Sequence, residues 1–200
     1  MKIAVFVSGR GSNLSAILNS LDLKNLVEVV AVISDKANCR AFEIAKVFNI
    51  KCFTVGAKED QISEANITHL LQSLKVDFIV LAGYLKLIPP DLIKYFENRI
   101  INIHPALLPS FGGKGMYGIN VHRAVFNSSV KVSGATIHFV DNTYDTGKIV
   151  AQKCVDISNV NSPEEIAERV LEIEHLLLPE VLKAFAKNKI KVEAGRVIVL

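Results

Sequence analysis

The sequence alternates between short apolar runs and segments with helical periodicity, and this alternation restricts the fold more than any other feature. The apolar runs, rich in β-branched residues, cover residues 2–8, 27–34, 51–55, 78–82 and 100–103. Segments with apolar residues every three or four positions lie between them, at residues 14–20, 40–48, 61–74 and 90–96. Runs that are apolar throughout are typical of strands buried on both faces. The alternation therefore predicts an α/β fold, a twisted and mostly parallel sheet with helices on both faces.

The chain beyond residue 130 departs from this alternation. Residues 130–140 and 149–156 are two strand-like runs joined by a turn-rich segment, which predicts a mixed far edge of the sheet. Ser162, Pro163 and Glu165 suit a helix N-cap and first turn, so a long helix is expected from there towards residue 187. Residues 191–200 suggest a small hairpin. Since no repeat or interdomain linker is visible, we expect a single domain over residues 1–200.

The composition fits a globular enzyme and argues against several other classes of protein. Half of the 200 residues are hydrophobic, 22% are charged and the net charge is +3. The lysines are too scattered to suggest a nucleic-acid or membrane partner. The 3 cysteines are far apart and form no CxxC pair, which speaks against disulfides and a zinc site. We expect a cytoplasmic protein, a monomer or a homodimer, without a metal, a signal peptide or a membrane span.

Asn102 and His104 end the last parallel run, directly before Pro105. Alternate residues of a strand point to the same face, so the two side chains are expected side by side, and the proline turns the chain out of the sheet. An amide beside an imidazole suits chemistry at a carbonyl carbon, because one group can donate to an oxyanion while the other moves a proton. The alternative is a structural pair, an asparagine that satisfies a turn beside a partly buried histidine.

Residues 9–13 (Gly-Arg-Gly-Ser-Asn) lie between the first apolar run and the first helical segment. Backbone N–H groups at such a strand-to-helix turn can bind an anion. A dinucleotide site with Asp35 as the ribose-binding acid is the competing interpretation, but Leu14 occupies the third glycine position of that fingerprint. A ligand the size of a monophosphate is therefore favoured. The segment could also be a tight turn with Ser12 or Asn13 as the helix N-cap.

Asp145 lies before Thr-Gly in the turn between the last two runs. A carboxylate there could pair with His104 across the end of the sheet and raise the proton affinity of the imidazole. An aspartate before Thr-Gly is also ordinary turn chemistry. His138 is expected to be a packed or supporting histidine, and no partner is visible for His69 or His122. The late helix is expected to carry three further polar residues on a solvated face: Glu172, Glu174 and His175.

Five segments combine these features in a fixed order. They are residues 8–14 (SGRGSNL), 81–84 (LAGY), 102–109 (NIHPALLP), 134–140 (GATIHFV) and 145–147 (DTG). In this order they resemble the phosphoribosylglycinamide formyltransferases, folate-dependent enzymes of purine biosynthesis, from residue 1 to about residue 185. Methionyl-tRNA formyltransferase and formyltetrahydrofolate deformylase share the Asn-x-His-Pro segment and the later aspartate. We do not expect the additional domains of those relatives in this chain.

The resemblance implies a formyltransferase-type fold and a one-carbon transfer reaction. The amine of 5'-phosphoribosylglycinamide would attack the formyl group of the co-substrate 10-formyltetrahydrofolate directly, through a tetrahedral intermediate. Asn102 and His104 would stabilise the oxyanion, and Asp145 would hold and polarise His104. The ribonucleotide would be bound by Gly11, Ser12, Asn13 and Glu174. The folate would be bound by Leu85, Lys86, Leu87, Ile88, Asn102, Asp141, Asn142, Thr143 and Tyr144.

Two features depart from the family pattern. Lys86 stands where many members carry an arginine near the folate's glutamate tail, so a bidentate contact becomes a point charge. The segment of residues 111–118 is longer and richer in glycine than in some relatives, and we expect it to be mobile when the site is empty.

Hydrolysis of the same folate is the alternative reaction. A nicotinamide-binding or nucleotide-sensing protein, based on Gly9, Gly11 and Asp35, is the alternative from a different class.

Overall fold

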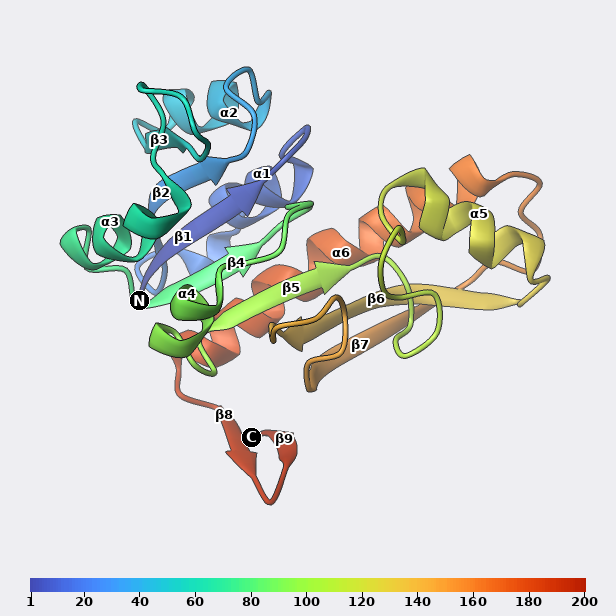
Figure 1. Cartoon of the computed structure of the whole chain (residues 1–200). Helices are drawn as coiled ribbons and strands as arrows, with labels where there is room; N and C mark the ends of the chain where they lie inside the picture. Colours follow the sequence, from blue (N-terminus) through green and yellow to red (C-terminus); the bar gives the residue numbers. More distant parts are fainter.

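The computed structural model describes residues 1–200, and its main element is a twisted sheet of seven strands (Figure 1). The first five strands run parallel: β1 (Lys2–Val7), β2 (Glu28–Ser34), β3 (Lys51–Thr54), β4 (Phe78–Leu81) and β5 (Ile100–His104). Two antiparallel strands follow at one edge: β6 (Val132–Phe139) and β7 (Ile149–Asp156). The spatial order is β3-β2-β1-β4-β5-β6-β7. The predicted parallel sheet with a mixed far edge is confirmed.

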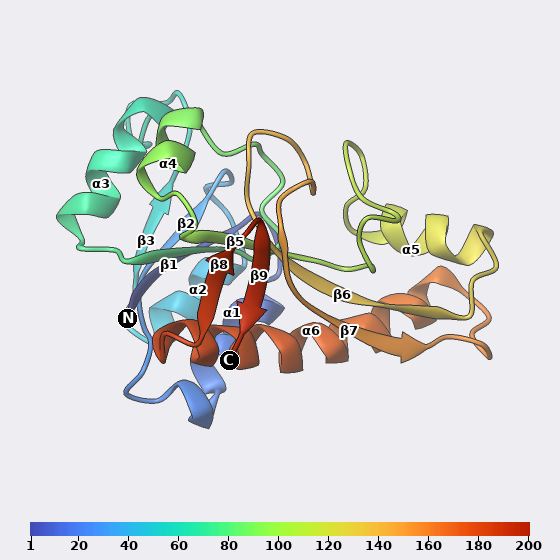
Figure 2. The same ribbon diagram turned by 90° about the horizontal axis from the view of Figure 1, so that it is seen from below.

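Helices cover both faces of the sheet (Figure 2). On one face lie α1 (Ser12–Asn19), α2 (Ala41–Val47) and the long α6 (Pro163–Ala186). On the other lie α3 (Ile67–Ser73) and α4 (Pro90–Tyr95). Helix α5 (Ile119–Asn127) packs against α6, and the short 3-10 helices η1 (Leu21–Leu23) and η2 (Glu64–Asn66) precede β2 and α3. None of the helices combines the length and the apolar character that a membrane crossing requires.

Strand β1 shows how the apolar runs build a core on each side of the sheet. Ile3, Val5 and Val7 belong to the core under α1, α2 and α6, whereas Ala4 and Phe6 belong to the core under α3 and α4. All five side chains are fully buried. Neighbouring residues of a strand point to opposite faces, so a strand covered on both sides needs apolar residues at every position.

The helix predicted over residues 61–74 is shorter in the structure. Helix α3 begins only at Ile67, because Ile62 forms a parallel bridge with Val55 after the end of β3. The Ile62 N–H donates to Thr54 O at 2.8 Å, and Ile62 O accepts from the Gly56 N–H at 3.0 Å. These bonds to the edge of the sheet take the place of the first turns of the expected helix.

The long helix and the final hairpin are as predicted. Ser162 Oγ accepts from the Glu165 N–H at 3.2 Å at the start of α6, and Pro163 occupies its first turn. After α6, the strands β8 (Ile190–Glu193) and β9 (Arg196–Val199) pair with each other. This hairpin projects from the body of the molecule (Figure 1).

The strand order reverses between β1 and β4. From β1 the chain moves outward to β2 and β3, and it then returns to place β4 on the other side of β1. In open α/β sheets, ligands bind at the carboxyl ends of the strands beside such a reversal. The fold therefore brings residues 9–13, which follow β1, to the same edge of the sheet as Asn102 and His104, which end β5.

Candidate active site

A cleft of about 720 Å³ opens at this edge of the sheet, a volume typical of small-molecule sites. Its walls come from residues 9–13, the loop after β4, the end of β5, the loop before α5, the β6–β7 connection and one side of α6. The predicted binding residues that line it are Gly11, Ser12, Asn13, Leu85, Lys86, Leu87, Ile88, Asn102, Asp141, Thr143, Tyr144 and Glu174. The side chain of Asn142 is exposed and does not line the cleft.

Asn102, His104 and Asp145 come together in the wall of this cleft. Nδ1 of His104 lies 3.6 Å from Oδ2 of Asp145. Nδ2 of Asn102 donates to Oδ1 of Asp145 at 3.5 Å. The structure thus brings Asp145 to the two residues that end β5, as the sequence suggested, although the aspartate comes from the β6–β7 connection.

The Asp145 carboxylate is held by its own backbone and by its neighbours. Asp145 has a left-handed φ of 58°, which aspartate tolerates better than most residues. Its Oδ2 accepts from the Gly113 N–H at 2.9 Å. Burial raises the pKa of Asp145, but its contacts with His138 and His104 and the hydrogen bond from the Gly113 N–H together lower it below the usual value. The carboxylate is therefore ionised at neutral pH.

His138 supports Asn102 from the neighbouring strand. It lies opposite Asn102 in the β5–β6 register and is buried. Its Nδ1–H donates to Phe139 O at 2.8 Å, which leaves Nε2 of the neutral ring as an acceptor. Nδ2 of Asn102 donates to this Nε2 at 3.1 Å, and Nε2 lies 3.5 Å from Oδ1 of Asp145. The prediction of a packed histidine is confirmed.

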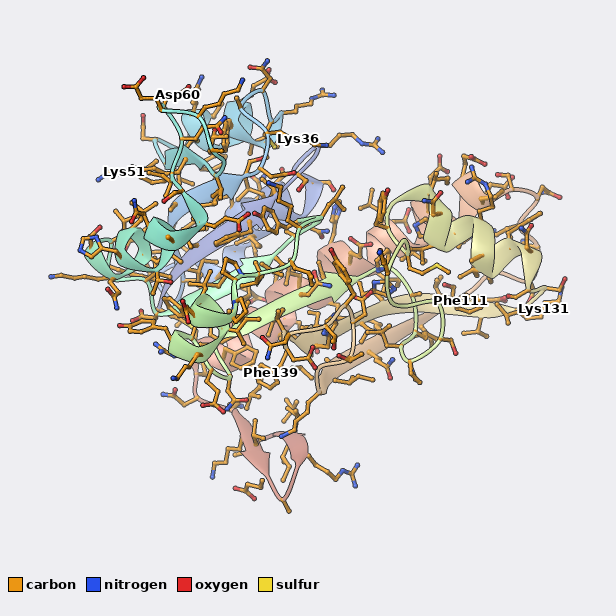
Figure 3. All side chains as sticks on the ribbon, in the orientation of Figure 1. Lys36, Lys51, Asp60, Phe111, Lys131 and Phe139 are labelled. Atoms are coloured by element: carbon orange, nitrogen blue, oxygen red, sulfur yellow. The ribbon has the colours of Figure 1, made fainter.

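The carbonyl of Phe111 assigns the tautomer of His104. Phe111 lies in the loop between β5 and α5 (Figure 3), and its oxygen is 2.9 Å from Nε2 of His104. A carbonyl oxygen can only accept, so Nε2 carries the proton. Burial lowers the pKa of His104 below its usual value, against the opposite effects of Asp145 and the Phe111 carbonyl. The ring at neutral pH is neutral, and its lone pair on Nδ1 is the position that takes up a proton.

The glycine segment starts α1 without a side-chain cap. The N-cap is Gly11, with a left-handed φ of 78°, so the interpretation of Ser12 or Asn13 as the N-cap is wrong. The Ser15 N–H donates to Gly11 O at 2.9 Å, and the N–H groups before it have no acceptor within the helix. A Cβ at residue 11 would lie 2.7 Å from Cβ of Ala41. Close packing of the loop on α2 and the positive φ therefore both require glycine.

Asp35 follows the end of β2 and binds the segment after β1, outside the cleft. Its Oδ1 accepts from Oγ of Ser8 at 2.6 Å. The Leu85 N–H donates to the same Ser8 oxygen at 3.1 Å. Asp35 does not line the cleft. These bonds tie β1 to the segments after β2 and β4, and the structure gives the dinucleotide interpretation no support.

Glu174 is buried, which corrects the expectation of a solvated helix face. Its side chain is 8% exposed, and Asn13 Nδ2 donates to Oε2 of Glu174 at 2.6 Å. Burial raises the pKa of Glu174 to about 7, against the opposite effect of the Asn13 amide. The Asn13 side chain therefore binds Glu174, and its remaining oxygen, Oδ1, is buried without a partner. The group of Asn13 that remains for the predicted phosphate contact is therefore its backbone N–H.

Several residues that line the cleft were not predicted from the sequence: Met116, Tyr117, Ile119, His122 and Leu171. His122 is buried in α5, and its Nδ1 has no hydrogen-bond partner. Burial, followed by the nearby His104, lowers the pKa of His122 to about 4. Its spacing of three residues from Val125, which is also buried, was an available signal, because it places the ring on the apolar face of the helix. The other unassigned histidine, His69, is exposed.

Comparisons with known proteins agree with this geometry. Residues 1–182 match the family model described as Formyl transferase. Over 195 residues the chain is 46% identical to "Phosphoribosylglycinamide formyltransferase, chloroplastic" of Arabidopsis thaliana, and the match covers 95% of this chain and 67% of that longer protein. The identity to the phosphoribosylglycinamide formyltransferase of Bacillus subtilis is 37%, with 91% of this chain and 93% of the relative covered.

A solved structure extends the agreement to three dimensions. The crystal structure of phosphoribosylglycinamide formyltransferase from Anaplasma phagocytophilum superposes with a TM-score of 0.89 at 34% identity. The superposition covers 100% of this chain and 94% of that one. The chain belongs to the formyl transferase family and, within it, to the phosphoribosylglycinamide formyltransferases.

Proposed function

We propose that residues 1–200 act as one domain that transfers the formyl group of 10-formyltetrahydrofolate to the amine of 5'-phosphoribosylglycinamide. The observation that carries the proposal is the meeting of Asn102, His104 and Asp145 on a cleft with two differently built ends. In the sheet, β5 lies between β1, which leads to the glycine segment, and β6, which leads to the β6–β7 connection. The reacting groups would therefore meet at the end of β5, between the two binding regions.

The acceptor fits the β1 side of the cleft. The open N–H groups at the start of α1 and the positive end of the helix dipole suit a phosphate. Glu174 reaches the same region through its bond to Asn13, and we assign it to the glycinamide end of the acceptor. With a pKa of about 7, the Glu174 carboxyl changes its charge near neutral pH, so an acceptor amine that arrives protonated would draw it towards the ionised form.

The folate fits the other side of the cleft. Leu85, Leu87 and Ile88 line the cleft; the two leucines are partly exposed and Ile88 is buried. The β6–β7 connection supplies the opposite wall with Asp141, Thr143 and Tyr144. Apolar side chains facing a few hydrogen-bonding groups suit a flat heteroaromatic ring such as a pterin. Lys86 would offer a single positive charge to the glutamate tail.

The reaction is a direct attack of the amine on the formyl carbon. As the new C–N bond forms, Asn102 donates to the oxygen that becomes negative, and this bond replaces its long contact with Asp145. His104 does not share the predicted oxyanion contact, because its only N–H donates to the Phe111 carbonyl. Its Nδ1 instead takes the proton from the attacking nitrogen, and Asp145 stabilises the resulting imidazolium. His104 then returns the proton to the folate nitrogen while the bond from that nitrogen to the formyl carbon breaks. The products are formylated ribonucleotide and tetrahydrofolate.

Folate release from 10-formyltetrahydrofolate, followed by absorbance with and without phosphoribosylglycinamide, tests the proposal. We expect release that requires the ribonucleotide and a ribonucleotide product heavier by one formyl group in mass spectrometry. Equal release without the ribonucleotide would identify a hydrolase that uses water as the acceptor. Absence of release under both conditions would contradict both reactions.

A further inference from the structure

We infer that Thr136 and Gln152 are positioning residues for formyl transfer, which hold the loop that orients His104. Neither side chain lines the cleft, so neither can touch the substrates. The inference rests on the proposed function, because it assigns these residues to the reaction of the same cleft. Its evidence is a set of hydrogen bonds that runs from β7 through β6 to the loop after β5.

The Thr136 hydroxyl is the centre of this set. Thr136 is fully buried in β6. Its Oγ1 donates to Ala106 O at 2.7 Å and accepts from the Leu108 N–H at 3.0 Å. It also accepts from Nε2 of Gln152 at 3.0 Å. A hydroxyl has one proton and two lone pairs, so the bonding capacity of Thr136 is fully used.

Gln152 completes a clamp on Leu108. Its Nε2 donates to Leu108 O at 2.8 Å as well as to Thr136. The backbone N–H and the carbonyl of Leu108 are thus both bound, one by each side chain of the clamp. Thr136 lies opposite His104 in the β5–β6 register and opposite Gln152 in the β6–β7 register. The clamp therefore stands directly beside the end of β5.

The position of Leu108 is passed on to His104 through the next residues of the loop. A Cβ on Gly112 would lie 2.5 Å from Cδ2 of Leu108 and 3.2 Å from Cβ of Asp145, so Gly112 is packed between these two side chains. On either side of Gly112, Phe111 O accepts from Nε2 of His104 at 2.9 Å and the Gly113 N–H donates to Asp145 at 2.9 Å. Release of Leu108 would free both contacts that orient the His104–Asp145 pair.

The test compares Thr136→Val with Thr136→Ser and Ser133→Ala. Valine keeps the size of threonine but cannot hydrogen-bond, whereas serine keeps the hydroxyl. Ser133 is the matched control, since it lies in the same strand, is buried, and its hydroxyl has no hydrogen-bond partner. We expect Thr136→Val to lower kcat by about tenfold or more while KM for both substrates changes by less than about threefold. Thr136→Ser and Ser133→Ala should stay within about threefold of the unchanged protein in kcat.

A second readout does not depend on turnover. In ¹⁵N-labelled protein, the ring nitrogens of His104, assigned by comparison with His104→Ala, should show the Nε2–H tautomer in the unchanged protein, Thr136→Ser and Ser133→Ala. Thr136→Val should show a mixture of tautomers, because Phe111 O no longer holds the Nε2 proton. A folded Thr136→Val with unchanged kcat and an unchanged tautomer would overturn the inference.

If Thr136→Val does not fold, Gln152→Leu provides the test of the inference. Gln152 is itself exposed on the edge strand β7, so its replacement leaves the core intact. It should lower kcat and mix the His104 tautomers in the same direction, and an unchanged Gln152→Leu would then overturn the inference. Failure of the unchanged protein to formylate the ribonucleotide would contradict the proposed function, whereas the tautomer comparison would still decide whether the clamp orients His104.

Discussion

Nδ1 of His104 faces Oδ2 of Asp145 at 3.6 Å, which is longer than a hydrogen bond. The distance is consistent with a neutral ring whose Nδ1 lone pair is turned towards a carboxylate, since Nε2 already donates to the Phe111 carbonyl. Uptake of a proton at Nδ1 would convert this contact into an attractive ion pair. The pair is thus arranged to stabilise the charged ring only while a proton is in transit.

The first prediction concerns this pair. His104→Ala and Asp145→Asn should each lower kcat by about 10² to 10⁴, because the first removes the proton carrier and the second the charge that stabilises it. Binding of phosphoribosylglycinamide by isothermal titration should stay within about threefold, because the proposed phosphate site lies after β1. His69→Ala, at an exposed histidine outside the cleft, serves as the control. Near-normal kcat in either variant would contradict the assignment.

Gly11→Ala should weaken acceptor binding specifically. The new Cβ would lie 2.7 Å from Cβ of Ala41 and the residue would keep a φ of 78°, so the segment before α1 must shift. Steady-state kinetics should show KM for phosphoribosylglycinamide raised by about tenfold, with KM for the folate changed by less than about threefold. Equal increases in both KM values would show that residue 11 does not belong to the acceptor side.

Glu174 should make the protein less stable as the pH rises. Its pKa is about 7 in the folded protein against an ordinary value of 4.5, so the folded state keeps a proton that the unfolded state releases. The stabilising effect is complete below pH 4.5 and is lost as the pH rises through 7. We expect the free energy of unfolding, measured with urea, to decrease from pH 5 to pH 8. This decrease should be about 2 to 3 kcal/mol larger in the unchanged protein than in Glu174→Gln. The same decrease in both would rule out a neutral Glu174.

His122 should have the opposite effect on stability and make the folded protein less stable as the pH falls. Burial lowers its pKa from 6.5 to about 4, so between these pH values the unfolded state binds a proton that the folded state does not. The free energy of unfolding should fall over that range by roughly 2 kcal/mol more in the unchanged protein than in His122→Asn. His69→Asn, at an exposed position, should retain the full acid sensitivity. Thermal unfolding at pH 7 and pH 4.5 provides the comparison.

The parts of the fold that depend on local pattern were predictable. Apolar runs with residues such as Ile3 to Val7 require burial on both faces, and the Ser162 N-cap is a local hydrogen bond to Glu165. The start of α3 was missed, because it is decided by a bridge between Val55 and Ile62 that helical periodicity does not register. Long-range backbone pairing overrode the local preference there.

In the site, sequence reasoning found the chemical groups but not what surrounds them. Glu174 lies four residues after Val170 and four before Leu178, both buried, so the helical spacing was a signal for its burial. Its partner Asn13 lies on another helix, and no pattern within α6 shows that contact. The tautomer of His104 depends on the carbonyl of Phe111, a group that every residue possesses. Backbone contacts of this kind carry no residue-type signal, so only the three-dimensional arrangement shows them.

The reversal of strand order also separates the two proposed binding regions. The proposed acceptor side is built from the first strand–helix unit and α6, whereas the proposed folate side is built from the loop after β4 and the β6–β7 connection. Between them, the end of β5 meets both. A new acceptor could therefore be accommodated by remodelling the first of these regions while the donor and the group it carries stay the same. In such a family, the formyl-donor region would stay constant while the acceptor-binding region varies.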